Sequence, residues 1–240
     1  MKVLVLRAAG TNCDRETAHA FAVAGAEPES RHVNELLREP QLLHGYRILV
    51  VPGGFSYGDD VAAGRVLATE LKQRVLPAAK RFAADGGLVL GICNGFQVLA
   101  KTGLLPGWDE QSVTLVHNDS HRYQDEWVEL EARGGRCPFV EEGERYAFPI
   151  AHAEGKFVAS DATLDRLERE GHVVFRYARN PNGSLRDIAG ICDATGRVLG
   201  LMPHPERHLE PWHHPSWTRQ GLAEEADGHR FFRRMVAAVS

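Results

Sequence analysis

The sequence predicts an α/β fold: a doubly wound, mostly parallel sheet with additional antiparallel strands in its second half. Three observations support this prediction. In the first half, short continuous apolar runs, typical of strands buried on both faces, alternate with helical patterns. Their spacing fits strand–helix–strand units, whose crossovers are right-handed. In the second half, apolar runs are separated by turn residues, as expected for antiparallel strands.

The first half contains the strands and helices expected to form the parallel sheet. Uninterrupted apolar residues mark the strands, and apolar residues at helical spacing mark helices that end at glycine. The expected elements are strands over residues 3–6, 48–51 and 88–92, and helices over 16–24, about 65–84 with a break at Pro77, and 94–101.

The second half has shorter strands and a final helix. Strands are expected over residues 112–116, 126–131, 145–150, 173–177, 188–191 and 198–202, the last two forming a hairpin around CDATGR at 192–197. An amphipathic helix over about 220–239 is expected to bury Leu222, Ala226, Phe231, Phe232 and Met235. We find no repeat or linker and expect a single domain over residues 1–240.

Composition and charge exclude several classes of protein. The chain has 240 residues, 43% of them apolar, so it can bury enough surface to fold. Its 28 basic and 32 acidic residues give a net charge of −4, which argues against a nucleic-acid-binding protein. The N-terminus meets a charge too soon for a signal peptide, and no apolar run suits a membrane span, so we expect a cytoplasmic protein with reduced cysteines.

The strongest chemical signal is GICNG at residues 91–95, between an expected buried strand and an expected helix. Small residues two before and two after a nucleophile allow the sharp turn of a nucleophile elbow. This turn would place Cys93 at the carboxyl end of the strand, where the start of the helix favours a thiolate. The backbone N–H of Asn94 would then point toward an oxyanion. A merely structural buried cysteine explains the elbow equally well when it is considered alone.

A base for this thiol is expected after the strand at 198–202, where PHPE follows at 203–206. Residues two apart on an extended segment point the same way, and Pro205 restricts the backbone of His204. Glu206 could therefore hold one ring nitrogen of His204 while the other nitrogen faces Cys93. A surface turn is the ordinary alternative, which the presence of the elbow disfavours.

Paired glycines follow the strand at 48–51 in the segment PGGFSYGD at 52–59. Gly53 and Gly54 allow backbone N–H groups to approach a ligand closely and could supply a second oxyanion donor. A phosphate-binding loop is the rival interpretation, but no Gly-Lys-Ser/Thr follows. A tight strand-to-helix turn without function is also compatible with this motif.

Together these motifs resemble the class I (triad) glutamine amidotransferases, in particular the branch that supplies ammonia within purine biosynthesis. The resemblance rests on GTNCD at 10–14, PGGFSYGD at 52–59, GICNGFQ at 91–97, NDS at 118–120, PIAHAEG at 149–155, IAGI at 188–191 and MPHPER at 202–207. It implies a flavodoxin-like class I glutaminase fold. Three segments depart from the branch: RAA at 7–9, Ala153 in place of glycine, and DVAA at 60–63.

The resemblance also implies roles and partners. The implied roles are nucleophile for Cys93, general base and acid for His204, orienting carboxylate for Glu206, oxyanion or substrate contacts for Gly53, Gly54 and Asn94, and proximity to bound glutamine for Gln97. L-glutamine is the implied substrate, with no metal or cofactor in this chain. ATP and Mg²⁺ would belong to a separate synthetase subunit, joined by a small bridging subunit. Nucleic acid and membrane are not expected partners.

Two other functions remain open from the sequence. A metal-binding protein is suggested by the dense cluster of His204, Glu206, His208, His213 and His214, although prolines break any helical ligand spacing there. The same triad could instead serve a stand-alone cysteine hydrolase of γ-glutamyl substrates. Cys13 is expected to be structural or near a subunit contact.

Overall fold

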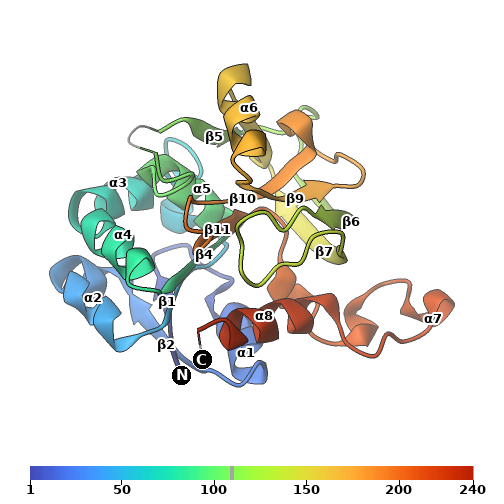
Figure 1. The fold of residues 1–240 in the computed structure, drawn as a ribbon, viewed down its shortest axis with the longest axis horizontal. Coiled ribbons are helices and arrows are strands. Elements are labelled where there is room, and N and C mark those ends of the chain that lie inside the picture. The colour runs from blue at the N-terminus through green and yellow to red at the C-terminus, as the bar shows by residue number, and fades with distance from the viewer. Residues whose placement is uncertain (109–110, 240) are drawn as a thin grey trace.

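Helices cover both faces of a large mixed sheet (Figure 1). The computed structural model describes residues 1–108 and 111–239, and within them the sheet has nine strands in the order β2-β1-β3-β4-β11-β10-β9-β6-β7. Its strands are β1 (Lys2–Arg7), β2 (Glu27–His32), β3 (Ile48–Val51), β4 (Leu88–Ile92), β6 (Gln124–Ala132), β7 (Arg145–His152), β9 (Val173–Tyr177), β10 (Ile188–Cys192) and β11 (Val198–Leu201).

The five strands from β2 to β11 are parallel, as the apolar runs predict. Every residue of β3, β4 and β11 is buried, because helices cover both faces of this part of the sheet. The carboxyl ends of these strands therefore meet at one edge of the sheet, which is where ligand sites of open α/β sheets lie.

The second half of the chain extends this same sheet with antiparallel strands, also as predicted. The expected hairpin forms between β10 and β11, and β9, β6 and β7 then pair antiparallel in turn. A separate two-stranded sheet joins β5 (Val113–Val116) to β8 (Lys156–Ala159). One cluster of buried apolar side chains includes residues from both halves of the chain.

The helices divide between the two faces of the sheet (Figure 1). The helices are α1 (Asp14–Val23), α2 (Val33–Arg38), α3 (Arg65–Arg74), α4 (Leu76–Ala84), α5 (Asn94–Thr102), α6 (Asp161–Arg169), α7 (Trp217–Gln220) and α8 (Asp227–Ala237). On one face α1 packs on α8, with the rings of Phe21 and Phe232 centred 4.9 Å apart. On the other face α3 contacts α2, α4 and α5. No helix described within residues 1–108 and 111–239 is long and apolar enough to cross a membrane.

The final helix is shorter than predicted. It begins at Asp227 rather than near residue 220, and Leu222, which was expected in its buried face, is 58% exposed. The physical reason is Gly221, whose φ of 82° ends the short helix α7 and separates it from α8. The expected helix over 65–84 is also divided, at Val75, so that Pro77 lies in the first turn of α4.

Candidate active site

Cys93 lies at a sharp turn between β4 and α5. Its φ of 50° and ψ of −106° are strained for a residue with a side chain. The flanking glycines make this turn sterically feasible: a Cβ on Gly95 would lie 1.8 Å from the carbonyl oxygen of Val51, and one on Gly91 would lie 2.8 Å from Gly95. The strand, turn and helix thus form the elbow that the sequence predicts, with Cys93 only 5% exposed.

His204 follows β11, the strand that pairs directly with β4. Its Nδ1 lies 2.7 Å from Oε1 of Glu206, and both side chains are almost completely buried. The expectation that an extended segment brings the two together is wrong, because Pro205–Arg207 forms a 3₁₀ turn. The fixed φ of Pro205 suits this turn, and the turn still places the carboxylate beside the ring.

The surroundings of His204 favour its charged form. Burial by itself would lower the pKa of this imidazole, but the Glu206 carboxylate and the Cys93 thiol group outweigh burial and raise the pKa well above its usual value. The other ring nitrogen, Nε2, is buried and makes no aligned hydrogen bond within the described residues. That nitrogen is therefore available to exchange a proton with a thiol or with a bound substrate.

Gly53 and Gly54 lie beside this pair at the end of β3. A Cβ on Gly53 would come within 2.8 Å of the His204 ring and 3.2 Å of the Cys13 sulfur, so only glycine fits between them. Gly54 has a φ of 136° and bridges to Thr11 in the loop that follows β1. The two glycines hence let the ring and two thiols approach one another closely.

The side chains of Asn94 and Gln97 are bonded within the protein. The amide oxygen of Asn94 accepts a hydrogen bond from the Ser56 hydroxyl at 2.6 Å, and its Nδ2 donates to Asp59 and Gln97. Gln97 in turn donates to the backbone carbonyl of Glu154 at 2.5 Å. These bonds fix the loop after β3 and the loop after β7 against the start of α5.

A small cleft opens above Cys93. Its walls come from the loop after β3, including Phe55 and Asp59, from the start of α5, and from residues 151–154, where β7 ends at His152. Its volume is about 50 Å³, far below the ~300 Å³ from which small-molecule pockets usually begin. A ligand of amino-acid size therefore enters only if a wall of the cleft moves.

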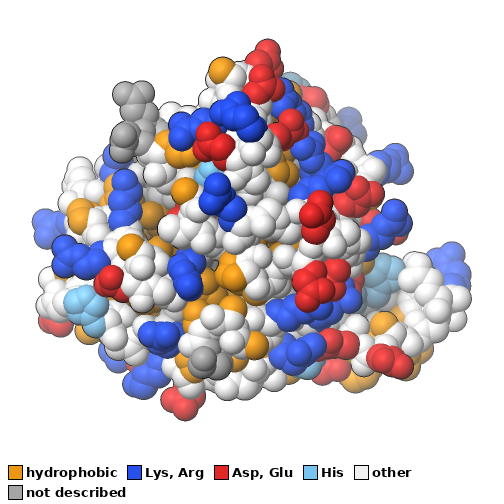
Figure 2. Space-filling view, viewed as in Figure 1, with side chains coloured by type: hydrophobic (Ala, Val, Ile, Leu, Met, Phe, Trp, Pro, Cys, Tyr) orange, Lys and Arg blue, Asp and Glu red, His pale blue; other side chains and the backbone are white. Residues whose placement is uncertain are grey.

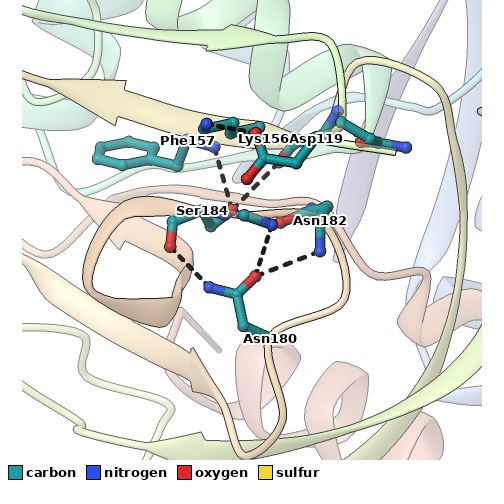
Figure 3. A network of polar contacts seen from close by, with 9 residues as sticks. Asp119, Lys156, Phe157, Asn180, Asn182 and Ser184 are labelled. Carbon is teal, nitrogen blue, oxygen red and sulfur yellow. Dashed lines mark hydrogen bonds and ion pairs between the residues drawn. The ribbon is translucent and has the colours of Figure 1, made fainter. Parts of the chain in front are cut away.

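The wall formed by residues 151–155 is anchored by an amide network. Asn118 donates from Nδ2 to the carbonyl of His152, and its Oδ1 accepts the backbone N–H of Gly155. Figure 3 shows the adjoining network, in which Ser184 Oγ accepts the backbone N–H of Phe157 at 3.0 Å. The sequence motifs identify Asn118 and His152, but nothing in the sequence reveals that the two are bonded to each other.

His152 is a lining residue that sequence reasoning gave no role. It is 3% exposed, its Nδ1 lies 3.2 Å from Asn118 Oδ1, and its Nε2 has no hydrogen-bond partner within the described chain. Burial, assisted by the charge of His204, lowers the pKa of His152 to about 4. This imidazole is accordingly neutral at pH 7, in contrast to His204.

The lowered pKa of His152 predicts a loss of stability in acid. Between pH 6.5 and 4 the unfolded chain binds a proton at this residue and the native protein does not, so the free energy of unfolding falls as pH falls. The loss from this one group should reach about 2 kcal/mol at pH 5. His204 adds no pH dependence to the unfolding free energy in that range. The stability due to its raised pKa is fully present below pH 6.5 and is lost only at higher pH.

Urea unfolding at pH 7.5 and pH 5.0 checks this prediction. The difference in unfolding free energy between the two pH values should be about 2 kcal/mol smaller in His152→Gln than in the wild type. His44→Gln, at an exposed position, should change with pH as the wild type does. An equal pH dependence in all three proteins would show that His152 titrates normally.

Cys13 is also closer to this site than the sequence suggests. It is 2% exposed, its sulfur accepts a hydrogen bond from Arg207 at 3.3 Å, and His204 affects its pKa, which burial raises. The loop after β1 brings it there, because its backbone N–H donates to the carbonyl of Gly53. Cys13 is thus a second thiol beside the same imidazole.

The predicted histidine cluster does not converge as a set of metal ligands. Nδ1 of His208 lies 2.7 Å from a backbone carbonyl, and the rings of His208 and His214 pack against Trp127. Within residues 1–108 and 111–239 the one candidate ligand group is Cys13, Glu16, His204 and Glu206. That group fits a cation poorly, because Arg207 already bonds Glu16 and Cys13, and Glu206 lies on the Nδ1 side of the ring.

Comparison with known proteins gives the class that this fold and site suggest. Residues 1–238 match the family model of the CobB/CobQ-like glutamine amidotransferase domain. The chain therefore belongs to this family of glutamine amidotransferases.

Within the family the similar curated proteins are the PurQ subunits of phosphoribosylformylglycinamidine synthase. The PurQ subunit of Dehalococcoides mccartyi is 45% identical over 98% of this chain and 96% of the relative. The PurQ subunit of Archaeoglobus fulgidus is 39% identical, also over 98% of this chain and 96% of the relative. A chain in the structure of PurLQS from Thermotoga maritima superposes with a TM-score of 0.79, at 33% identity, over 100% of this chain and 99% of that one.

Proposed function

We propose that this chain is the glutaminase subunit of phosphoribosylformylglycinamidine synthase. It would hydrolyse L-glutamine to glutamate and ammonia and pass the ammonia to a synthetase subunit, which converts formylglycinamide ribonucleotide and ATP to the amidine. The observation that carries the proposal is the buried His204–Glu206 pair next to the elbow cysteine, in a chain 45% identical to a PurQ subunit.

The reaction proceeds through a thioester on Cys93. The Cys93 thiol gives its proton to Nε2 of His204, and the thiolate attacks the side-chain amide carbon of glutamine. The tetrahedral oxyanion accepts hydrogen bonds from the backbone N–H groups of Gly54 and Asn94. The protonated ring of His204 donates its Nε2 proton to the leaving nitrogen, so the C–N bond breaks and ammonia departs. His204 then takes a proton from water, the hydroxide attacks the thioester, and glutamate leaves as the thiol forms again.

Each supporting residue has a distinct task in this proposal. Glu206 holds Nδ1 of His204, which fixes the ring orientation and stabilises its charged form. Gly53 leaves room for the ring. Gln97 and Asn94 hold the cleft walls together and so position glutamine rather than react with it.

The partners follow from the relatives. The similar Thermotoga maritima chain comes from a structure of PurLQS, in which PurQ is grouped with PurL and PurS. We infer that this chain likewise assembles with a PurL synthetase subunit and a small PurS bridging subunit. ATP and Mg²⁺ would bind to the synthetase, and this chain would need neither a metal nor a cofactor. One domain, over residues 1–240, would supply the entire glutaminase site.

Labelling with an electrophilic glutamine analogue, 6-diazo-5-oxonorleucine, tests the site. We expect one adduct per chain, confined to the peptide that contains Cys93, and protection by excess glutamine. Cys13 is the internal control, since it is a thiol beside the same imidazole. An adduct on Cys13, or no adduct even with PurL and PurS present, would refute the assignment.

A stand-alone hydrolase of γ-glutamyl substrates would use the same residues. At about 50 Å³ the cleft admits neither glutamine nor a γ-glutamyl peptide without movement of its walls, so its volume does not separate the two functions. Residues Tyr57, Asp59 and Val61 all have positive φ, so the loop after β3 is strained and a plausible wall to move. Rapid hydrolysis of γ-glutamyl peptides by the chain alone would favour this second function.

A further inference from the structure

A hollow separate from the Cys93 cleft is lined by cationic and hydrogen-bonding side chains. It has a volume of about 290 Å³ and lies between α3, α5 and the segment that leads through β5. We call it the basic pocket and define it by its polar lining residues Arg65, Thr69, Lys72, Gln73, Lys101, Gln111 and Thr114. Among residues 1–108 and 111–239, no acidic side chain contributes to its lining.

The three cations of the basic pocket make no close ion pairs with the acidic residues that the structure describes. Within the part of the chain that the structure describes, Arg65, Lys72 and Lys101 form no ion pair within 4.0 Å. Basic residues of α8, and those next to β2, do form such pairs. On the face shown in Figure 2, basic side chains over α3 and α4 are exposed with few acidic ones between them. Because the whole chain has a net charge of −4, this local excess of positive charge does not follow from composition.

Of the three cations, Lys101 has the ammonium group with unmet hydrogen-bonding capacity in a buried position. Its Nζ is buried and has no hydrogen-bond partner among the described residues. Burial lowers its pKa, and Arg65 adds to this effect, while Glu154 and Asp59 act against it from the side of the Cys93 cleft. A phosphate in the pocket would reach this ammonium group after a rotation of the Lys101 side chain, and it would then supply the hydrogen-bond acceptors that the ammonium lacks.

The lining side chains of α3 come from one side of that helix. Thr69 follows Arg65 by four residues along α3, and Lys72 and Gln73 follow Thr69 by three and four, so all four lie on one side of the helix. Lys101 from α5 and Thr114 from β5 complete the lining. The result is a concave group of charges and neutral donors, which suits the oxygens of a tetrahedral phosphate.

We propose that the basic pocket binds a phosphorylated small molecule through its phosphate oxygens. The volume suits a compact ligand, such as a sugar phosphate or a diphosphate, rather than a large cofactor. An acidic protein segment is less favoured, because it would need cations spread along a groove, and here the three cations from α3 and α5 line one hollow.

Isothermal titration calorimetry on the full chain tests the proposal, with inorganic pyrophosphate and ribose 5-phosphate as probes at 0.15 M salt, about physiological ionic strength. We expect saturable binding of one molecule per chain. Lys72→Gln and Lys101→Met should each weaken it at least tenfold. Lys80→Gln, an exposed change on neighbouring α4 outside the lining, should leave it unchanged.

Melting followed by circular dichroism distinguishes loss of binding from loss of folding. Lys72→Gln alters an exposed side chain and should retain the wild-type melting temperature. Absence of binding by both probes would overturn the proposal, as would equal weakening by Lys80→Gln, which would indicate diffuse attraction to a basic surface. Binding of a hexaglutamate peptide that depends on Lys72, with no binding of either phosphate probe, would assign the pocket to an acidic protein segment instead.

Discussion

Replacement of Cys93 by serine should lower the kcat for glutamine hydrolysis by on the order of 10³-fold or more, because a serine hydroxyl in this position lacks the acidity and nucleophilicity of a thiol. The substitution is nearly isosteric, and the strained backbone at φ 50° is retained, so the melting temperature should stay close to that of the wild type. Glutamine hydrolysis measured with PurL and PurS present gives the comparison.

Two further measurements make this result specific. Synthesis driven by added ammonium instead of glutamine should survive in Cys93→Ser, since only the glutaminase step is removed. Cys13→Ser is the matched variant, because its sulfur lies beside the same imidazole and is also buried. We expect Cys13→Ser to lose less than tenfold. If Cys13→Ser lost the activity and Cys93→Ser kept it, the nucleophile would have been misassigned.

Replacement of Gly95 by alanine should be the most damaging single change to the fold. The new methyl group would lie 1.8 Å from the carbonyl oxygen of Val51, a backbone atom that cannot rotate away. Either α5 moves off β3 or the buried strand bends, and overpacking of this kind costs about 3 kcal/mol of unfolding free energy or more. The elbow at Cys93 would move with the helix, so glutaminase activity should fall as well.

Gly45→Ala provides the control for this prediction, since a Cβ at that position meets nothing within 4 Å. Its unfolding free energy should lie within about 1 kcal/mol of the wild type or above it. Urea unfolding of both variants measures the difference directly. Equal stability of Gly95→Ala and Gly45→Ala would mean that the contact between α5 and β3 relaxes without cost.

The two predictions concern one feature, the turn from β4 to α5. Cys93 is held in a strained conformation because β4, α5 and the end of β3 pack without space for any side chain at Gly91 or Gly95. Strain of this kind persists only where the surrounding structure determines it. The reactivity that we propose for Cys93 and the stability of the parallel sheet therefore depend on the same close contacts.

Signals that are local along the chain were sufficient to predict much of this protein. The buried parallel strands, the elbow and the adjacent His204–Glu206 pair are each encoded within a short segment, so periodicity and spacing reveal them. The strand β2 was missed, because its sequence EPESRH is polar and its residues are at best half-buried at the edge of the sheet. Its pairing with β1 makes it a strand, and no hydrophobic pattern does.

The sequence by itself determined the α/β class, the positions of the main strands along the chain and the side chains of the candidate triad. Tertiary structure alone decided that Cys13 lies against His204, that His152 is buried and neutral beside the cleft, and that Arg65, Lys72 and Lys101 line one pocket. The physical reason is that these contacts join segments far apart in the chain. They exist only because the sheet places β1, β3, β4 and β11 side by side and packs α5 against α3.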